Sequence, residues 1–124
     1  MRTKPRMVAV VIGILALLVC AGPAYAYPRK SVLTAAGWNC WKNDGTYFLL
    51  TLTEDDRYGR SQPVGGQGTY RYNRDAGKVN FRSGPMEDLF GKLSQGLGGW
   101  DMRVKRDSTG ATWGNCQNYT AGGM

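Results

Sequence analysis

The sequence from Gly68 to Pro85 reads GTYRYN, then RDAG, then KVNFRSGP, and it predicts the β-hairpin around which the rest of the chain can be arranged. Tyr70 and Tyr72 alternate with polar residues in the first run, and Val79 and Phe81 do so in the second. Apolar residues at every second position are typical of a strand with one buried face. The stretch therefore predicts two antiparallel strands that share one apolar face.

The loop of this hairpin determines how the two strands pair. If residues 74–77 form a four-residue loop, Asn73 faces Lys78 and the apolar residues of both strands fall on the same face. A shift by one residue would place apolar side chains against polar ones, so the register is strongly specified. Gly77 can adopt the positive φ that the end of such a loop requires.

The first 26 residues have the features of a secretory signal peptide. Three basic residues precede an apolar run over residues 7–21, and Ala24 and Ala26 form an A-x-A pattern that predicts cleavage after Ala26. An uncleaved membrane anchor is an alternative, although the run is short for a span. Lipid attachment at Cys20 is another, although Val19 stands where such signals have a small residue. We therefore expect a secreted, periplasmic or cell-envelope protein with no stable membrane span after cleavage.

Cleavage changes the charge and size of the chain. The signal segment carries three of the 16 basic residues and none of the nine acidic ones, so the remaining 98 residues have a net charge of +4. This mild charge gives no reason to expect a nucleic-acid partner. A chain of this length can bury one core, which predicts a single domain.

Two of the three cysteines, Cys40 and Cys116, remain after cleavage. An exported protein folds in an oxidising compartment, so we expect a disulfide between them. In the chain-entropy model such a bond stabilises the fold by roughly 4 kcal/mol. Two free thiols or a metal pair are the alternatives, but a metal site lacks histidine ligands because the chain has no histidine.

A second hairpin is predicted near the start of the mature chain. Residues 37–42 and 46–53 form the strands, and the Asn-Asp-Gly sequence at 43–45 is a strong turn signal. With Lys42 opposite Thr46, alternation separates two faces. The residues expected on the buried face are Trp38, Cys40, Phe48, Leu50 and Leu52. The opposite face carries Trp41, Tyr47, Leu49 and Thr51, which is apolar for a surface in water and suggests a ligand site, a partner, or cover from the N-terminal leader.

The remaining segments complete an all-β chain. Before the central hairpin we expect a frayed leader at 27–34, a charged loop at 54–61 and a connector at 62–67. The three carboxylates of the charged loop predict either a solvated turn or a calcium-binding turn. After the hairpin we expect one or two helical turns or an irregular loop at 85–93, a flexible loop at 95–99, a strand at 100–105, a turn at 107–110 and a last strand at 111–116. The expected organisation is a signal peptide at 1–26, a leader at 27–36, a β-barrel domain at 37–116 and a flexible tail at 117–124. The fold class is a small antiparallel β-barrel, or a strongly bent sheet, of six to eight strands with one disulfide.

The residue content excludes several kinds of catalysis. Without histidine there is no Ser-His or Cys-His nucleophile pair and no imidazole base. A pair of carboxylates held across a cleft at a fixed separation is the remaining enzymatic route, and no sequence motif places two of them in that way. The carboxylates that could serve are Glu54, Asp55, Asp56, Glu87 and Asp101. We expect a protein without enzymatic activity, cofactor or metal.

Aromatic residues offer the best candidates for a binding surface. Trp41 and Trp113 lie out of phase with the predicted core, and Tyr47 lies on the same face as Trp41. Tyr58 and Arg60 come from the neighbouring charged loop. Core packing is the alternative role for most of the aromatic residues. The exterior cations Arg71, Arg82, Arg103 and Lys105 suggest an anionic wall polymer or an acidic protein as partner, or an ordinary solvated strand exterior.

Short motifs in three places resemble those of small exported lipocalin-like or calycin-like barrel proteins. They are Gly68-x-Tyr70, then Gly77-x-Val79-x-Phe81-x-Ser83-Gly84-Pro85, and Thr109-Gly110 leading to Cys116. The likeness covers residues 37–116, but the chain is shorter than a lipocalin and lacks an early Gly-x-Trp and a long helix near the end. Its size and single disulfide also resemble compact barrels that inhibit lysozyme in bacterial envelopes. The resemblance implies a barrel without catalytic motifs.

These observations lead to one functional expectation and two alternatives. We expect a secreted binding module for an apolar ligand, a glycan or an extracellular protein. An inhibitor of a secreted lysozyme or protease is the first alternative, and a carboxylate-dependent hydrolase is the second.

Overall fold

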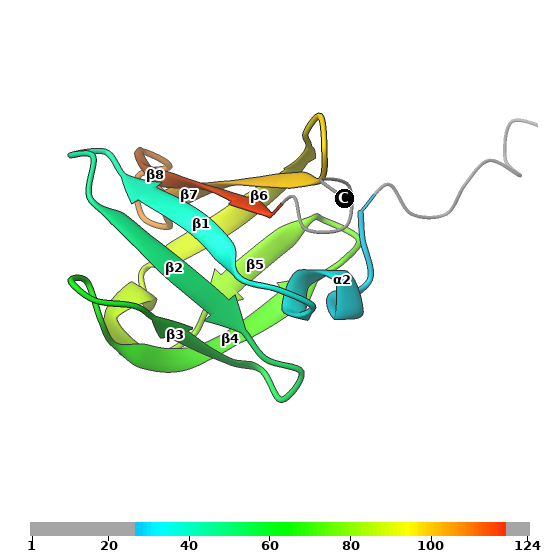
Figure 1. The fold of residues 1–124 in the computed structure, drawn as a ribbon, viewed down its shortest axis with the longest axis horizontal. Helices are drawn as coiled ribbons and strands as arrows, with labels where there is room; N and C mark the ends of the chain where they lie inside the picture. Colours follow the sequence, from blue (N-terminus) through cyan, green and yellow to red (C-terminus); the bar gives the residue numbers. More distant parts are fainter. Residues whose placement is uncertain (1–26, 119–124) are drawn as a thin grey trace, which may run out of the picture.

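The computed structural model describes residues 27–118 and shows eight antiparallel strands that close into a barrel (Figure 1). Each strand pairs with the next in the chain, and the last pairs with the first. The strands are β1 (Trp38–Lys42), β2 (Tyr47–Leu52), β3 (Arg57–Arg60), β4 (Gln67–Asn73), β5 (Lys78–Phe81), β6 (Leu89–Gln95), β7 (Trp100–Arg106) and β8 (Thr112–Asn118). The predicted fold class is confirmed, with the number of strands at the top of the expected range.

Both predicted hairpins have the expected register. Tyr70 pairs with Phe81 and Tyr72 with Val79 between β4 and β5, and Gly77 has a positive φ of 63°. In the first hairpin, Lys42 donates its backbone N–H to the Thr46 carbonyl oxygen. Cys40 pairs with Phe48 and Trp38 pairs with Leu50. The alternation of apolar residues and the turn sequences therefore predicted the pairing of these strands correctly.

A disulfide spans the closure of the barrel. Cys40 of β1 and Cys116 of β8 are direct partners in the strand ladder, and their sulfur atoms are bonded. The prediction is confirmed. The bond joins the two strands that are farthest apart in the sequence. It therefore holds the barrel closed at the one strand pair that no short loop connects.

Side chains fill the interior of the barrel. The fully buried side chains include Trp38, Phe48, Leu50, Tyr70, Met86, Leu93, Met102 and Val104. They come from both hairpins and from β6 and β7, so the core joins all parts of the sheet. The rigid wall that this packing supports is what positions the outward-facing residues.

Two predicted loops contain strands instead. Within the charged stretch 54–61, residues 57–60 form β3, and Tyr58 points into the core with 2% of its surface exposed. At 85–93, where helical turns or an irregular loop were expected, a single 3-10 turn, η1 (Gly84–Met86), and a two-residue turn precede β6. Leu89, Gly91 and Leu93 are buried on one face of β6, which is the two-residue period of a strand.

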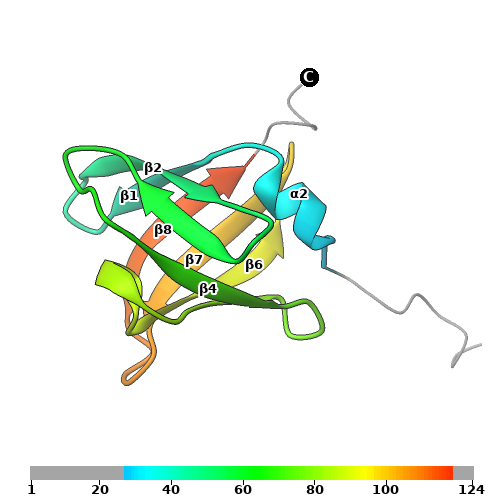
Figure 2. The same cartoon turned by 90° about the horizontal axis from the view of Figure 1, so that it is seen from below.

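The N-terminal leader is ordered, contrary to the expectation that it is frayed. Residues Lys30–Thr34 form a short helix, α2, at one end of the barrel (Figure 2). Leu33 is completely buried, and the Trp38 indole nitrogen donates a hydrogen bond of 3.0 Å to the Leu33 carbonyl oxygen. The leader therefore belongs to the core of the domain and does not cover the outer face of β1 and β2.

Several sequence expectations lie outside the described residues. These are the signal peptide, its cleavage after Ala26, the alternative anchor, lipid attachment at Cys20, and the tail beyond residue 118. The last strand is longer than predicted, because it includes Gln117 and Asn118. In residues 27–118, no helix is long and apolar enough to cross a membrane.

Candidate functional site: the outer face of β8, β1 and β2

The outer face formed by three neighbouring strands differs from the rest of the barrel exterior. Strand β1 lies between β8 and β2, and the exposed residues at their outward-facing positions are uncharged. These residues are Asn39, Trp41, Tyr47, Leu49, Thr51, Asn115 and Gln117. We call this set the uncharged face. Of the predicted cations, Arg71 and Arg82 are exposed at β4 and β5, and Lys105 is half-buried on β7. Arg103 is exposed at the border of the uncharged face, because it is the ladder partner of Asn115.

Aromatic rings lie at the centre of the uncharged face. Trp41 and Tyr47 are direct ladder partners, and their ring centroids are 5.5 Å apart with a 55° tilt. About two-fifths of each residue is exposed, 40% for Trp41 and 44% for Tyr47. The Tyr47 hydroxyl donates a hydrogen bond of 2.6 Å to the Asn39 side-chain oxygen. The sequence correctly predicted that these two rings lie together on the surface.

A groove borders the uncharged face between β2, β3 and β4. Its volume is about 600 Å³, and its lining includes Leu49, Thr51, Gly59, Ser61 and Gln67. Gly59 pairs with Thr51 of β2 and with Gln67 of β4, so it lies between the two walls. The sequence pattern did not indicate a role for Gly59, because the charges around residues 57–60 predict a loop. Recognising the alternation around Tyr58 as a strand would have placed Gly59 on the outer surface.

Two residues from the predicted site have other roles. Tyr58 is buried, and its hydroxyl donates to the Ser83 carbonyl oxygen at 2.8 Å and accepts from the Met86 backbone N–H at 2.9 Å. Tyr58 is therefore almost completely buried, although it also contributes to the lining of the groove. Arg60 lines the groove, but its Nε donates to the Gly65 carbonyl oxygen at 2.6 Å and its guanidinium lies over the Phe48 ring.

Trp113 does not share a face with Trp41. The pairing of β7 with β8 shifts by one residue, since Val104 pairs with Gly114 while Lys105 pairs with Thr112. Trp113 is the extra residue of this bulge, which changes the direction of its side chain. Its ring packs edge-on against the buried Phe48, at a centroid distance of 5.9 Å. Strict alternation placed it outward, and a bulge leaves no signal in the hydrophobic pattern.

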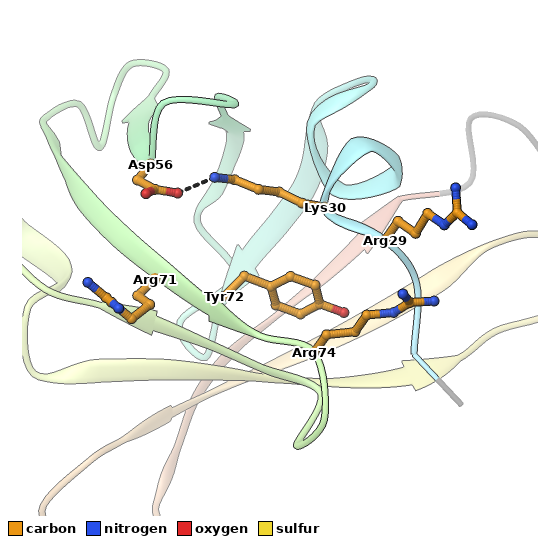
Figure 3. Close-up of a pocket in the computed structure, with 6 residues that line it drawn as sticks. All are labelled: Arg29, Lys30, Asp56, Arg71, Tyr72 and Arg74. Carbon is orange, nitrogen blue, oxygen red and sulfur yellow. Dashed lines mark hydrogen bonds and ion pairs between the residues drawn. The ribbon is translucent and has the colours of Figure 1, made fainter. Parts of the chain in front are cut away.

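A second cavity is basic and lies beside α2 (Figure 3). It has a volume of about 390 Å³ and is lined by Arg29, Lys30, Asp56, Arg71, Tyr72 and Arg74. Figure 3 shows that Arg71 points to one side of Tyr72, while the Arg29 and Arg74 guanidinium groups lie on the other. The cations are thus spread along the cavity and do not converge on one point.

Hydrogen bonds of this basic cavity hold the leader on the barrel. The Tyr72 hydroxyl donates to the Pro28 carbonyl oxygen at 2.6 Å, and Arg74 Nε donates to the Tyr27 carbonyl oxygen at 3.0 Å. Lys30 forms an ion pair with Asp56 across to the loop after β2. A structural role in docking α2 accounts for these three side chains.

The adjacent carboxylates of residues 54–56 are bound by their neighbours. Glu54 accepts a hydrogen bond of 2.6 Å from the Thr34 hydroxyl, and Asp56 pairs with Lys30. The Thr53 hydroxyl donates to Asp55 and holds the pKa of that carboxyl below its ordinary value. A lowered pKa is the opposite of what a general acid needs. Within residues 27–118, no group of three or more acidic, histidine or cysteine side chains is arranged to hold a metal ion.

Comparison of the chain with protein-family models, with curated proteins and with solved structures found no match in any of the three.

Proposed function

We propose that this protein is an exported binding module without enzymatic activity, and that its ligand contacts the uncharged face around Trp41 and Tyr47. The observation that carries the proposal is the composition of this face. Three adjacent strands present aromatic and amide side chains to solvent, with no charged residue among their outward-facing exposed positions. Depletion of charge together with exposed aromatic rings is typical of binding surfaces.

The packed interior supports binding on the outside of the barrel. Lipocalins enclose a small ligand within an eight-stranded barrel, which requires an open interior. Here Trp38, Phe48 and Tyr70 occupy the interior and are completely or almost completely buried. We therefore propose that the chain resembles lipocalins in its barrel architecture only, and that its ligand binds on the outside of the barrel.

The proposal of export draws on the predicted signal peptide and on the disulfide. A bond between Cys40 and Cys116 is typical of proteins that fold in an oxidising compartment. Two observations favour binding over catalysis. The carboxylates at 54–56 already bond neighbouring side chains, and the sequence has no histidine.

A binding screen with matched variants tests the proposal. The mature protein would be tested against neutral polysaccharides, lipid vesicles and purified secreted hydrolases, including lysozyme. The test variant replaces both Trp41 and Tyr47 with alanine. Phe90→Ala is the control, because Phe90 is a half-buried ring on β6, among the cations of the other side.

We expect the double variant to lose the binding that the native protein and the Phe90→Ala variant share. Equal binding by all three proteins would contradict the proposal. A tight one-to-one complex with a hydrolase that slows its turnover would identify the protein ligand as the target of an inhibitor, and loss of that complex in the double variant would assign it to the same face.

A further inference from the structure

Gly59 creates a hollow in the outer surface of the sheet. It lies within β3, where its neighbours in the ladder are Thr51 and Gln67. A Cβ atom built on Gly59 would have no heavy atom within 4 Å, and the residue does not have a positive φ. Neither packing nor backbone conformation therefore requires glycine here. Glycine within a strand weakens it, and it often marks a place where a ligand approaches the backbone closely.

The side chains that line this hollow can both donate and accept hydrogen bonds. Thr51 and Ser61 contribute hydroxyl groups, and Gln62 and Gln67 contribute amides. Sugar hydroxyl groups also donate and accept, so the two sets are complementary in chemistry.

Two arginines of the groove are already engaged within the protein. Arg57 lies 3.6 Å from Asp55 in an ion pair, and Arg60 Nε bonds the Gly65 carbonyl oxygen. The charge of Arg57 is offset by Asp55, whereas Arg60 bonds a neutral carbonyl and keeps its charge. The other side chains that line the groove are uncharged, so the groove suits a ligand rich in hydroxyl groups.

Leu49 connects the groove to the aromatic rings. It lines the groove and follows Tyr47 by two residues on β2, so their side chains are neighbours on the same face. Trp41 lies beside Tyr47 on β1. A continuous path therefore runs from the ring pair across Leu49 to Gly59, and it crosses strands β1, β2 and β3.

We propose that this path binds an extended, uncharged oligosaccharide, with sugar rings against Trp41 and Tyr47 and further residues of the chain in the groove over Gly59. The inference rests on the proposed function and names the ligand class of the same face. A protein interface of standard size buries about 800 Å² on each partner around an apolar centre. This face has three exposed large apolar residues, Trp41, Tyr47 and Leu49, and its other side chains carry amides and hydroxyls. Such a small apolar centre suits a sugar chain better than a protein interface.

Filling the hollow tests the inference without damaging the fold. Gly59→Val places a β-branched side chain in the groove, where the strand should tolerate or favour it. Gly59→Ala is a smaller version of the same change. Asn80→Val is the control, because it places the same side chain on the outer face of β5. Binding to insoluble chitin, cellulose and β-1,3-glucan would be measured, with alginate as the anionic comparison.

We expect the native protein to bind at least one of the neutral polysaccharides. It should bind alginate weakly or not at all. Gly59→Val should weaken that binding at least about tenfold, Gly59→Ala should weaken it less, and Asn80→Val should leave it unchanged. The thermal midpoint of Gly59→Val should equal or exceed that of the native protein. If valine impairs folding, the alanine variant decides the test.

The possible failures separate the two proposals. Native affinity in both Gly59 variants would overturn the groove as part of the site, while loss of binding in the Trp41/Tyr47 double variant would still support the proposed function. Binding of a protein or a lipid vesicle in place of every neutral polysaccharide would overturn the glycan inference alone. Unchanged binding in the double variant would overturn both.

Discussion

The hydroxyl of Tyr72 donates a hydrogen bond of 2.6 Å to the carbonyl oxygen of Pro28, 44 residues earlier in the chain. Two other inward-facing tyrosines make the same kind of bond. Tyr58 donates to Ser83, and Tyr70 donates to Thr53 at 2.7 Å. Each ring packs in or against the core while its hydroxyl holds the backbone of a connecting segment. Tyrosine thereby fixes the leader and two loops to the wall of the barrel.

Replacement of Tyr72 by phenylalanine should loosen the leader. The ring remains, but the Pro28 carbonyl loses its donor, so we expect a loss of about 1 kcal/mol in the free energy of unfolding. Hydrogen exchange of the amides in α2 should become faster, while exchange in β6 and β7 stays unchanged. Tyr47→Phe is the control, because its hydroxyl bonds the exposed Asn39 side chain. Equal protection of α2 in the native and Tyr72→Phe proteins would contradict this role.

Alkaline pH should destabilise the fold through these tyrosines. Burial raises the pKa of Tyr72 from 10.0 to about 12 and raises the pKa of Tyr58 and Tyr70 as well. The folded state therefore keeps protons that the unfolded state releases, so the stabilisation is complete below pH 10 and is lost as pH rises toward 12. Tyrosinate absorbance and denaturant melts should report this loss together. Tyr72→Phe should show a shallower decline, and a flat profile across this range in the native protein would contradict the prediction.

The disulfide should contribute strongly to stability. Cys40 and Cys116 are 76 residues apart in sequence, and a loop of this length corresponds to about 4 kcal/mol in the chain-entropy model. We expect the Cys40→Ala/Cys116→Ala double variant to lose an amount of this order in guanidinium denaturation. Chemical reduction of the native protein should give a similar loss. A reduced protein as stable as the oxidised one would show that strand pairing alone closes the barrel.

Glycines of neighbouring strands should respond differently to alanine. A Cβ atom on Gly68 would lie 2.1 Å from the Ser83 carbonyl oxygen, a backbone atom that cannot move aside easily. We expect Gly68→Ala to cost about 1–3 kcal/mol, whereas Gly59→Ala, with open space around the new atom, should cost little or nothing. Thermal denaturation of the two variants measures the contrast. Equal losses would show that the space above Gly59 is not open in solution.

The two tryptophans of β1 should separate stability from binding. Trp38 is completely buried and Trp41 is 40% exposed, although they are three residues apart. Trp38→Ala should destabilise the fold by about 3–5 kcal/mol. Trp41→Ala should cost far less stability and reduce ligand binding. The comparison needs one denaturation curve and one binding curve for each variant, and a large stability loss for Trp41→Ala would indicate a structural role.

Local sequence patterns were sufficient for much of the fold. The pairing of Tyr70 with Phe81 followed from alternation and a four-residue loop, and the pairing of Cys40 with Phe48 followed from the Asn-Asp-Gly turn. Both hairpins are formed by residues close in sequence, so their register depends on turn geometry and on one apolar face. The disulfide was predictable because the predicted signal cleavage would leave two cysteines. The exposed positions of Trp41 and Tyr47 followed from the same alternation.

Contacts between distant segments decided the rest. Burial of Tyr58 made a strand from a charged stretch, and a bulge turned Trp113 toward Phe48. The N-terminal leader has no strong helical pattern of its own, and the burial of Leu33 in the core, with its carbonyl bonded to Trp38, holds it in place. The sequence by itself determined which residues alternate, where the chain turns and which cysteines can pair. The predicted bond between Cys40 and Cys116 already placed the last strand beside the first, and the structure confirms it. Only the tertiary structure decided that β3 pairs with β2 and that Gly59 leaves a hollow next to the aromatic rings. Such relationships depend on which strands become neighbours in space, and no short stretch of sequence contains that information.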